Sequence, residues 1–377
     1  MSRIFCWYFS AETIYCFVNT LDIIWFIGYD DFSPSDDDTS AERSIALASI
    51  RDVARLAHVS PATVSRILNN RGYISDESRK KVEAAMKKLD YQPNEVARAL
   101  SKKSSNVIGL IVPHINNPYF AEVISNLENE AKKKRYNILL FNSKSNDDNE
   151  LKYIDMCKSN RVAGIIMMSG SVQMEEFSGL NVPLITIERN LECGTASIEC
   201  DNFHGGEMAA RQLIECGAKT LLHISGVNET EMPADERSVG FAKVCEAQGV
   251  WHREIKTTVK QYDSGEYHEL LTELLLEYPE VDGIFASSDV IAAQLIQVSK
   301  KLGKRVPEDL KIVGFDDINI ASLTTPTITS IRQPIKEMAS TAIKFLLDAA
   351  AGKVVPTRMI LPVQLNERES CSRGMIS

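Results

Sequence analysis

Hydrophobic residues between positions 49 and 91 recur at helical spacing in three short runs. The first run spaces its apolar side chains at i, i+3, i+4 and i+7, which predicts one buried helix face: Ile50, Val53, Ala54 and Ala57. Ser60 followed by Pro61 predicts the N-cap and first residue of a second helix. Its expected buried side is Val64, Ile67 and Leu68. A third helix is expected after Ser75, with buried positions Val82, Ala85, Met86 and Leu89.

Three such helices, with a tight turn between the first two, predict a helix-turn-helix whose second helix lies in the major groove of DNA. The residues left on the outer side of that helix are Pro61, Ala62, Ser65 and Arg66. The alternative is a small helical subdomain that has no nucleic-acid role.

Charge is segregated along the chain in a way that the net charge of −9 conceals. Residues 1–46 carry 2 basic and 8 acidic side chains, whereas residues 47–106 carry 12 basic and 6 acidic ones. The remaining 28 basic and 37 acidic side chains lie in residues 107–377. A short basic module on an acidic body is the electrostatic footprint of a nucleic-acid contact, which favours the DNA-binding interpretation.

Residues 93–106 predict a short helix followed by a linker. Pro93 is placed to start the helix, which has about eight residues of helical potential and is therefore marginal alone in water. Residues 101–106 are polar. This helix should form only when something else stabilises it.

Residues 107–377 alternate helical stretches with continuous apolar runs, which are typical of parallel strands buried on both faces. The first set of runs is 107–112, 137–141, 164–168 and 184–187. The second set is 221–224, 283–286 and 311–315. Two sets predict an α/β domain of two doubly wound lobes with a ligand cleft between them.

The helical region resembles the LacI-type transcriptional repressors, which include the lac, purine and ribose repressors. The resemblance rests on Ile50-Arg51-Asp52-Val53-Ala54, Val59-Ser60, Thr63-Val64-Ser65-Arg66, Val82-Glu83-Ala84-Ala85-Met86 and Tyr91-Gln92-Pro93-Asn94, and it extends from about Ala48 to the C-terminus. It implies a helix-turn-helix headpiece, a hinge helix and an effector domain similar to periplasmic sugar-binding proteins. The implied protein is a DNA-binding transcriptional regulator, most simply a repressor of carbohydrate utilisation genes.

The resemblance also implies a homodimer that reads a pseudo-palindromic operator, with a hinge leucine wedged into a minor-groove step. That leucine maps to Leu100, the recognition pair to Pro61 and Ala62, and the most direct base reader to Arg66. The full set expected to contact DNA is Ser60, Pro61, Ala62, Thr63, Ser65, Arg66, Asn69, Asn94, Ala97 and Leu100. A small, apolar recognition pair leaves the operator sequence open.

The loops at strand ends contain side chains suited to a sugar, which needs carboxylates and guanidinium groups for its hydroxyls and aromatic planes for its C–H faces. These residues are Asn117, Tyr119, Phe120, Glu188, Arg189 and Asp316. The resemblance to ribose-type binding proteins adds Arg237, Tyr262, Ser288, Asp289 and Gln333. The implied effector is a small sugar or sugar phosphate, with a purine as the alternative.

Several of these residues have a purely structural alternative. Tyr119 and Phe120 could be core residues, Glu188 and Arg189 a surface pair, and Asp289 a helix cap. Where many family members have Asp, this chain has Glu188, which is one methylene longer and leaves the hydroxyl spacing open.

Enzymatic, metal and cofactor roles have no signature in the chain. The motifs G-x-G-x-x-G, the P-loop, G-x-S-x-G and H-E-x-x-H are missing, and the pair Gly205-Gly206 lacks the dinucleotide fingerprint. The eight cysteines include no C-x-x-C pair and the six histidines have no metal-type spacing. We therefore expect reduced thiols, no catalytic site and a cytoplasmic protein.

The expected domains are 1–46, an apolar and acidic extension; 47–92, the headpiece; 93–106, the hinge; and 107–377, the effector-binding and dimerisation domain. The extension has no uninterrupted apolar run long enough for a spanning helix and no convincing signal-peptide pattern. No methionine lies between Met1 and Met86, and headpieces of the family that this chain resembles begin only a few residues before the first helix. We therefore expect translation to start at Leu47, which a UUG codon could encode.

Two alternatives for residues 1–46 stay open: a regulatory arm, and a membrane anchor for a sugar-binding protein of a transport system. The helix-turn-helix headpiece argues against the membrane-anchor alternative, because a sugar-binding protein of a transport system has no such headpiece. We further expect no C-terminal tetramerising coiled coil, because few residues follow Ser370.

Overall fold

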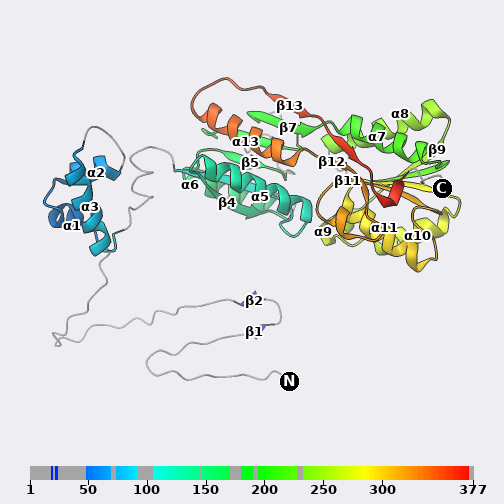
Figure 1. Ribbon diagram of the computed structural model, residues 1–377, viewed down its shortest axis with the longest axis horizontal. Helices are drawn as coiled ribbons and strands as arrows, with labels where there is room; N and C mark the ends of the chain where they lie inside the picture. Colours follow the sequence, from blue (N-terminus) through cyan, green and yellow to red (C-terminus); the bar gives the residue numbers. More distant parts are fainter. Residues whose placement is uncertain are drawn as a thin grey trace. The chain divides into compact units, whose positions relative to one another are not determined.

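The computed structural model describes residues 48–68, 74–91, 105–144, 146–169, 180–189, 194–226 and 232–372. It also describes a short antiparallel strand pair, β1 (Val18–Asn19) and β2 (Asp22–Ile23). The chain divides into two compact units, residues 1–93 and 94–377 (Figure 1). Asn69, Asn94, Ala97 and Leu100 lie outside the described residues.

The three helices of the first unit are α1 (Ile50–Leu56), α2 (Pro61–Leu68) and α3 (Asp76–Lys88). A capping box starts α1: the Asp52 amide donates to the Ser49 hydroxyl at 3.4 Å, and the Ser49 amide donates to the Asp52 carboxylate at 3.0 Å. His58 adopts a left-handed φ of 54° in the turn between α1 and α2. The expected apolar faces form one core, from Val53 on α1 to Val82 on α3. The predicted helix-turn-helix is confirmed.

The second unit contains two six-stranded sheets, each the centre of one lobe (Figure 1). The first sheet contains β3 (Val107–Val112), β4 (Asn137–Asn142), β5 (Ile165–Met167), β6 (Leu184–Ile187), β7 (Ala196–Cys200) and β13 (Arg358–Leu361). Its order is β13-β7-β6-β5-β3-β4, and every pair is parallel.

The second sheet contains β8 (Thr220–Ser225), β9 (Trp251–Lys256), β10 (Gly283–Ala286), β11 (Lys311–Asp316), β12 (Thr329–Arg332) and β14 (Gln364–Asn366). Its order is β14-β12-β11-β10-β8-β9, and only β14 runs antiparallel to its neighbour. The two predicted doubly wound lobes are therefore confirmed.

The helices of the first lobe are α5 (Pro118–Lys133), α6 (Asp147–Ser159) and α13 (Ile335–Ala350). Those of the second lobe are α7 (Asn202–Glu215), α8 (Glu236–Gln248), α9 (Val259–Ser264), α10 (His268–Glu277), α11 (Asp289–Lys301) and α12 (Ile320–Leu323). Two single turns, η2 (Pro233–Asp235) and η3 (Glu369–Cys371), complete it. Figure 1 shows α5 and α13 together on one lobe and α7 beside α8 on the other.

Within the described residues the chain passes between the lobes three times, after β7, after β12 and after β13. These crossings bring the carboxyl ends of the two parallel sheets to the same region, where ligands bind in open α/β folds. One expectation about burial is wrong. β4 is an edge strand whose Leu140 is 41% exposed, so it is not covered on both faces.

Candidate functional site

Acidic residues with left-handed backbone conformations lie at the strand ends that face the junction of the lobes. Glu188, directly after β6, has a φ of 53°, and Asp316, at the end of β11, has a φ of 100°. Such conformations cost of order 1–3 kcal/mol each in a residue that has a Cβ, and they concentrate at functional sites. This strain marks the two carboxylates as candidates for ligand contact.

Glu188 joins the two lobes through its carboxylate. The Cys200 amide donates to Oε1 at 2.6 Å, and the Asn202 side-chain amide donates to Oε2 at 2.9 Å. Asn202 is the first residue of α7, in the second lobe. Burial raises the pKa of Glu188, although Arg237 and these hydrogen bonds act in the opposite direction. The alternative that Glu188 and Arg189 form a surface pair is wrong for Glu188.

Arg237, on α8, is buried with 7% exposure and has a partner on each side of its guanidinium. Nε donates to Asn202 Oδ1 at 2.7 Å, and Nη1 donates to the Ser287 carbonyl at 2.9 Å. Nη2 lies 3.9 Å from Glu188 Oε2, and the group stacks 3.6 Å from the centroid of Phe315. The planar fork is therefore held in one orientation by its protein contacts.

Two glycines let α7 and α8 approach closely enough to place Arg237 against Asn202. A Cβ on Gly206 would lie 2.0 Å from the Arg237 carbonyl oxygen, and a Cβ on Gly240 would lie 2.0 Å from the Phe203 carbonyl oxygen. The Gly205-Gly206 pair thus has a packing role in this fold. Gly206 contacts α8, and a Cβ on Gly205 would lie 2.8 Å from the Phe315 ring of β11.

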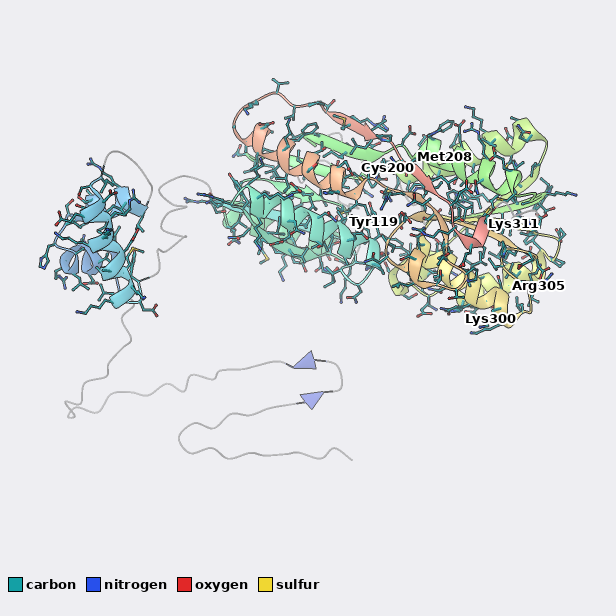
Figure 2. The ribbon with its side chains drawn as sticks, viewed as in Figure 1. Tyr119, Cys200, Met208, Lys300, Arg305 and Lys311 are labelled. Atoms are coloured by element: carbon teal, nitrogen blue, oxygen red, sulfur yellow. The ribbon has the colours of Figure 1, made fainter. Side chains whose placement is uncertain are left out.

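A hydrogen-bonded chain links the first lobe to Asp316. The Tyr119 hydroxyl, on α5, donates to Gln333 Oε1 at 3.2 Å, and Gln333 Nε2 donates to Asp316 Oδ1 at 2.8 Å. All three residues are buried. Burial raises the pKa of Asp316 to about 7, against the opposing effects of Arg237 and the Gln333 hydrogen bond. Figure 2 shows Tyr119 and Cys200 where the two lobes meet.

Three predicted ligand residues are used to shape the strand-end loops. Asn117 caps α5 by accepting from the Tyr119 amide at 2.9 Å. Ser288 caps α11 by accepting from the Ile291 amide at 3.3 Å, so the alternative that Asp289 is the cap is wrong. Asp289 is fully buried and accepts from the Ser330 hydroxyl at 2.6 Å and the Ile318 amide at 2.9 Å. These bonds fix the loop that follows Asp316.

Arg189 and Tyr262 lie at further contacts between the lobes. Arg189 Nη1 lies 2.8 Å from the Met232 sulfur of the second lobe. The Tyr262 ring meets His114 edge-on at a centroid distance of 5.2 Å. Phe120 and Tyr119 are buried in the same core and contact each other edge-on at 5.2 Å, so the core alternative is correct for both rings. Only Tyr119 also bonds a polar residue of the site, Gln333.

Sequence reasoning missed two contacts that cross between the lobes. His114 Nε2 lies 3.0 Å from the Asp263 carboxylate on α9, and Asn202 bonds both Glu188 and Arg237. The position of His114 two residues after β3 was a usable signal, since strand ends supply ligand loops.

The outer face of α2 carries the predicted DNA contacts. Pro61, Ala62 and Arg66 are exposed, whereas Thr63 and Ser65 are half-buried, so the outward placement of Ser65 is only partly correct. The Ser60 hydroxyl accepts from the Thr63 amide at 3.1 Å, which confirms the predicted N-cap. The basic, exposed Arg66 is therefore available to a base edge.

The described residues offer little for metal or nucleophilic chemistry. No group of three His, Cys, Asp or Glu in these ranges could hold a metal ion. The cysteines described there are free thiols, and burial raises the pKa of Cys157 and Cys245 to about 12. Among the described helices, none is long and apolar enough to cross a bilayer.

Comparisons with known proteins cover both units. Residues 49–94 match bacterial regulatory proteins of the lacI family, and residues 210–371 match a periplasmic binding protein-like domain. The ribose operon repressor of Halalkalibacterium halodurans is 36% identical over 329 residues, which are 87% of this chain and 98% of that protein.

Two solved structures share the fold. A periplasmic binding protein/LacI transcriptional regulator from Alkaliphilus metalliredigens, complexed with D-xylulofuranose, is 32% identical with a TM-score of 0.64, covering 71% of this chain and 100% of that one. The lac repressor dimer bound to operator and the anti-inducer ONPF has a TM-score of 0.76 at 23% identity, covering 86% of this chain and 99% of that one.

Proposed function

The chain belongs to the LacI family of bacterial regulatory proteins, and from this premise we propose that it is a DNA-binding transcriptional repressor controlled by a small carbohydrate. It acts as a homodimer on operator DNA, and it regulates genes of carbohydrate utilisation. The effector is a sugar or a sugar phosphate bound between the two lobes. Because operator DNA is its partner, its place of action is the bacterial nucleoid.

One observation carries this proposal: a headpiece with an exposed recognition face shares a chain with a preformed hydroxyl-binding cluster. We define the interlobe cluster as Tyr119, Glu188, Asn202, Arg237, Asp316 and Gln333. The cluster offers carboxylate acceptors and guanidinium and amide donors, which together suit the hydroxyls of a sugar. Arg189 and Tyr262 adjoin it, and Ser288 and Asp289 shape its loops.

Control of DNA binding follows from where the cluster lies. The hydrogen bonds of the cluster join residues of both lobes. If the lobes have two relative arrangements, the contacts available to a ligand differ between them, and the ligand binds one arrangement more tightly than the other. A ligand shifts an equilibrium only by its differential affinity for the two states. The sugar therefore changes operator affinity by favouring the lobe arrangement that it binds better.

We propose no catalytic activity for this chain. The cluster carboxylates and guanidinium are bonded to one another and to backbone groups, and the relatives are named as repressors. Orientation of hydroxyl groups, not bond cleavage, is the chemistry that this arrangement supports.

Arg66→Ala is expected to weaken binding to the operator far more than binding to random DNA. Arg66 is exposed on the recognition helix, and a good bidentate base contact contributes about 1–3 kcal/mol of discrimination, or roughly 5- to 150-fold. Fluorescence anisotropy on a genomic fragment selected by the wild-type protein, and on a scrambled fragment, measures both affinities.

The matched control is Arg55→Ala, which removes the same charge from an exposed position on α1. It should lower both affinities by similar factors, because a charge near DNA contributes mainly through phosphates. Equal losses on the two fragments for Arg66→Ala would show that Arg66 contacts phosphate and reads no base.

A further inference from the structure

Carboxylates outnumber guanidinium groups where the strand ends of the two lobes meet. Among the described residues there, Glu188, Asp289 and Asp316 supply carboxyl groups, while Arg189 and Arg237 supply guanidinium groups. A third arginine, Arg332 at the end of β12, pairs with Asp317 at 3.3 Å, so this pair adds one charge of each sign. Burial raises the pKa of Glu188, Asp289 and Asp316, so negative charge is already unfavourable in this interior. An added anion would meet the same penalty.

Arg237, which is more buried than Arg189, already contacts several protein groups. Arg237 donates to Asn202 and to the Ser287 carbonyl, lies beside Glu188, and covers the face of Phe315. The remaining Nη2 group lies 3.9 Å from Glu188, so a phosphate bound there would compete with that carboxylate for the guanidinium charge. A neutral hydroxyl can instead donate to Glu188 without moving the guanidinium.

The second cation, Arg189, carries a single charge and lies against the Met232 sulfur. A phosphate ester has a charge of about −1.5 to −2 at pH 7. The single positive charge of Arg189 cannot balance both the phosphate charge and the negative charge of the Glu188 carboxylate.

We propose that the effector is an uncharged sugar and that this protein discriminates against phosphorylated sugars and sugar acids. The proposal rests on the proposed function, because it assumes that the effector binds at the interlobe cluster. Neutral hydroxyls satisfy both the carboxylate acceptors and the amide and guanidinium donors of the cluster. A phosphate satisfies only the donors, and it is repelled by Glu188 and Asp316.

Calorimetry with matched pairs tests the discrimination on the full chain. The pairs are D-ribose with ribose 5-phosphate, D-fructose with fructose 6-phosphate, and sucrose with sucrose 6-phosphate. In each pair whose free sugar binds, the phosphate should bind at least about 100-fold more weakly, which corresponds to about 2.8 kcal/mol. Equal or tighter binding of a phosphate would overturn the proposal and leave the proposed function standing.

A charge variant separates electrostatic exclusion from a lack of space. At pH 8, above the Asp316 pKa of about 7, Asp316→Asn keeps an oxygen that accepts from Gln333 but removes the carboxylate charge, so the discrimination factor should fall about tenfold. The control Glu308→Gln removes an exposed carboxylate of the same lobe and should leave the factor unchanged. An unchanged factor in Asp316→Asn would overturn the electrostatic account. If calorimetry detects no binding of any of these sugars or sugar phosphates, the result counts against the proposed function, which assumes a carbohydrate effector.

Discussion

Arg237→Ala is expected to weaken sugar binding by about 100-fold or more, while the variant still binds DNA in the absence of sugar. Truncating a buried charged group that a binding site uses costs about 2–5 kcal/mol of binding free energy, because its partner charge is left uncompensated. Here Glu188 would lose its guanidinium neighbour, and Asn202 and the Ser287 carbonyl would lose their donor. Calorimetry measures the sugar affinity, and anisotropy on the selected DNA fragment measures the DNA affinity.

Two further variants make this result interpretable. Arg237→Lys keeps the positive charge but lacks the planar fork, so its sugar affinity should lie between those of the wild type and Arg237→Ala. Arg211→Ala removes an arginine of α7 that is 48% exposed and pairs with Glu207, and it should bind sugar normally. Wild-type sugar affinity in Arg237→Ala would show that the effector binds elsewhere.

Acid is expected to destabilise the second lobe through His223. This residue of β8 is 1% exposed, its ring stacks on Phe285 at 4.5 Å, and its Nδ1 lies 3.2 Å from the Phe285 carbonyl. Burial lowers the pKa of His223 from 6.5 to about 4. Between these pH values the unfolded chain binds the proton and the folded chain does not, so stability falls as the pH falls through this window.

The size of this effect follows from the pKa shift. Between pH 7 and pH 4, His223 should remove about 3 kcal/mol from the free energy of unfolding. Asp316 acts in the opposite direction, because its raised pKa of about 7 makes the folded state bind protons that the unfolded state releases. The His223 contribution must therefore be isolated by comparing two proteins that differ only at position 223.

His223→Phe provides this comparison, since a phenyl ring keeps the stacking on Phe285 and does not titrate. Urea unfolding at pH 7 and pH 4 should show that the wild type loses about 3 kcal/mol more than the variant over this interval. Equal losses in the two proteins would show that His223 does not resist protonation in the folded state.

The apolar pattern predicted strands whose residues are continuously apolar. It missed β7, a strand with a charged residue whose burial depends on a partner elsewhere in the chain. β3, β6 and β10 have the expected bounds because their side chains are continuously apolar. β7 was not predicted, since it contains Glu199, which is buried only because Arg358 of β13 pairs with it at 2.7 Å. That pairing joins distant parts of the chain, so no local pattern contains it.

The candidate site divides in the same way. Glu188 and Asp316 could be predicted from their places at strand ends, where parallel sheets bind ligands. Arg237 entered only through the family resemblance, because it lies within α8 and reaches the cluster through the close approach of α7 and α8. The bonds of Asn202 and His114 cross between the lobes, so they depend on how the three chain crossings align the sheets.

In the proposed function, one chain couples sugar binding at the interlobe cluster to operator binding by the headpiece. The most direct test is the affinity of the full-length protein for its selected DNA fragment, with and without a saturating neutral sugar that calorimetry shows to bind. We predict a change of about tenfold or more, consistent with the usual size of allosteric coupling, and no change in Arg237→Ala. A sugar that binds the wild-type protein and leaves its DNA affinity unaltered would contradict the account.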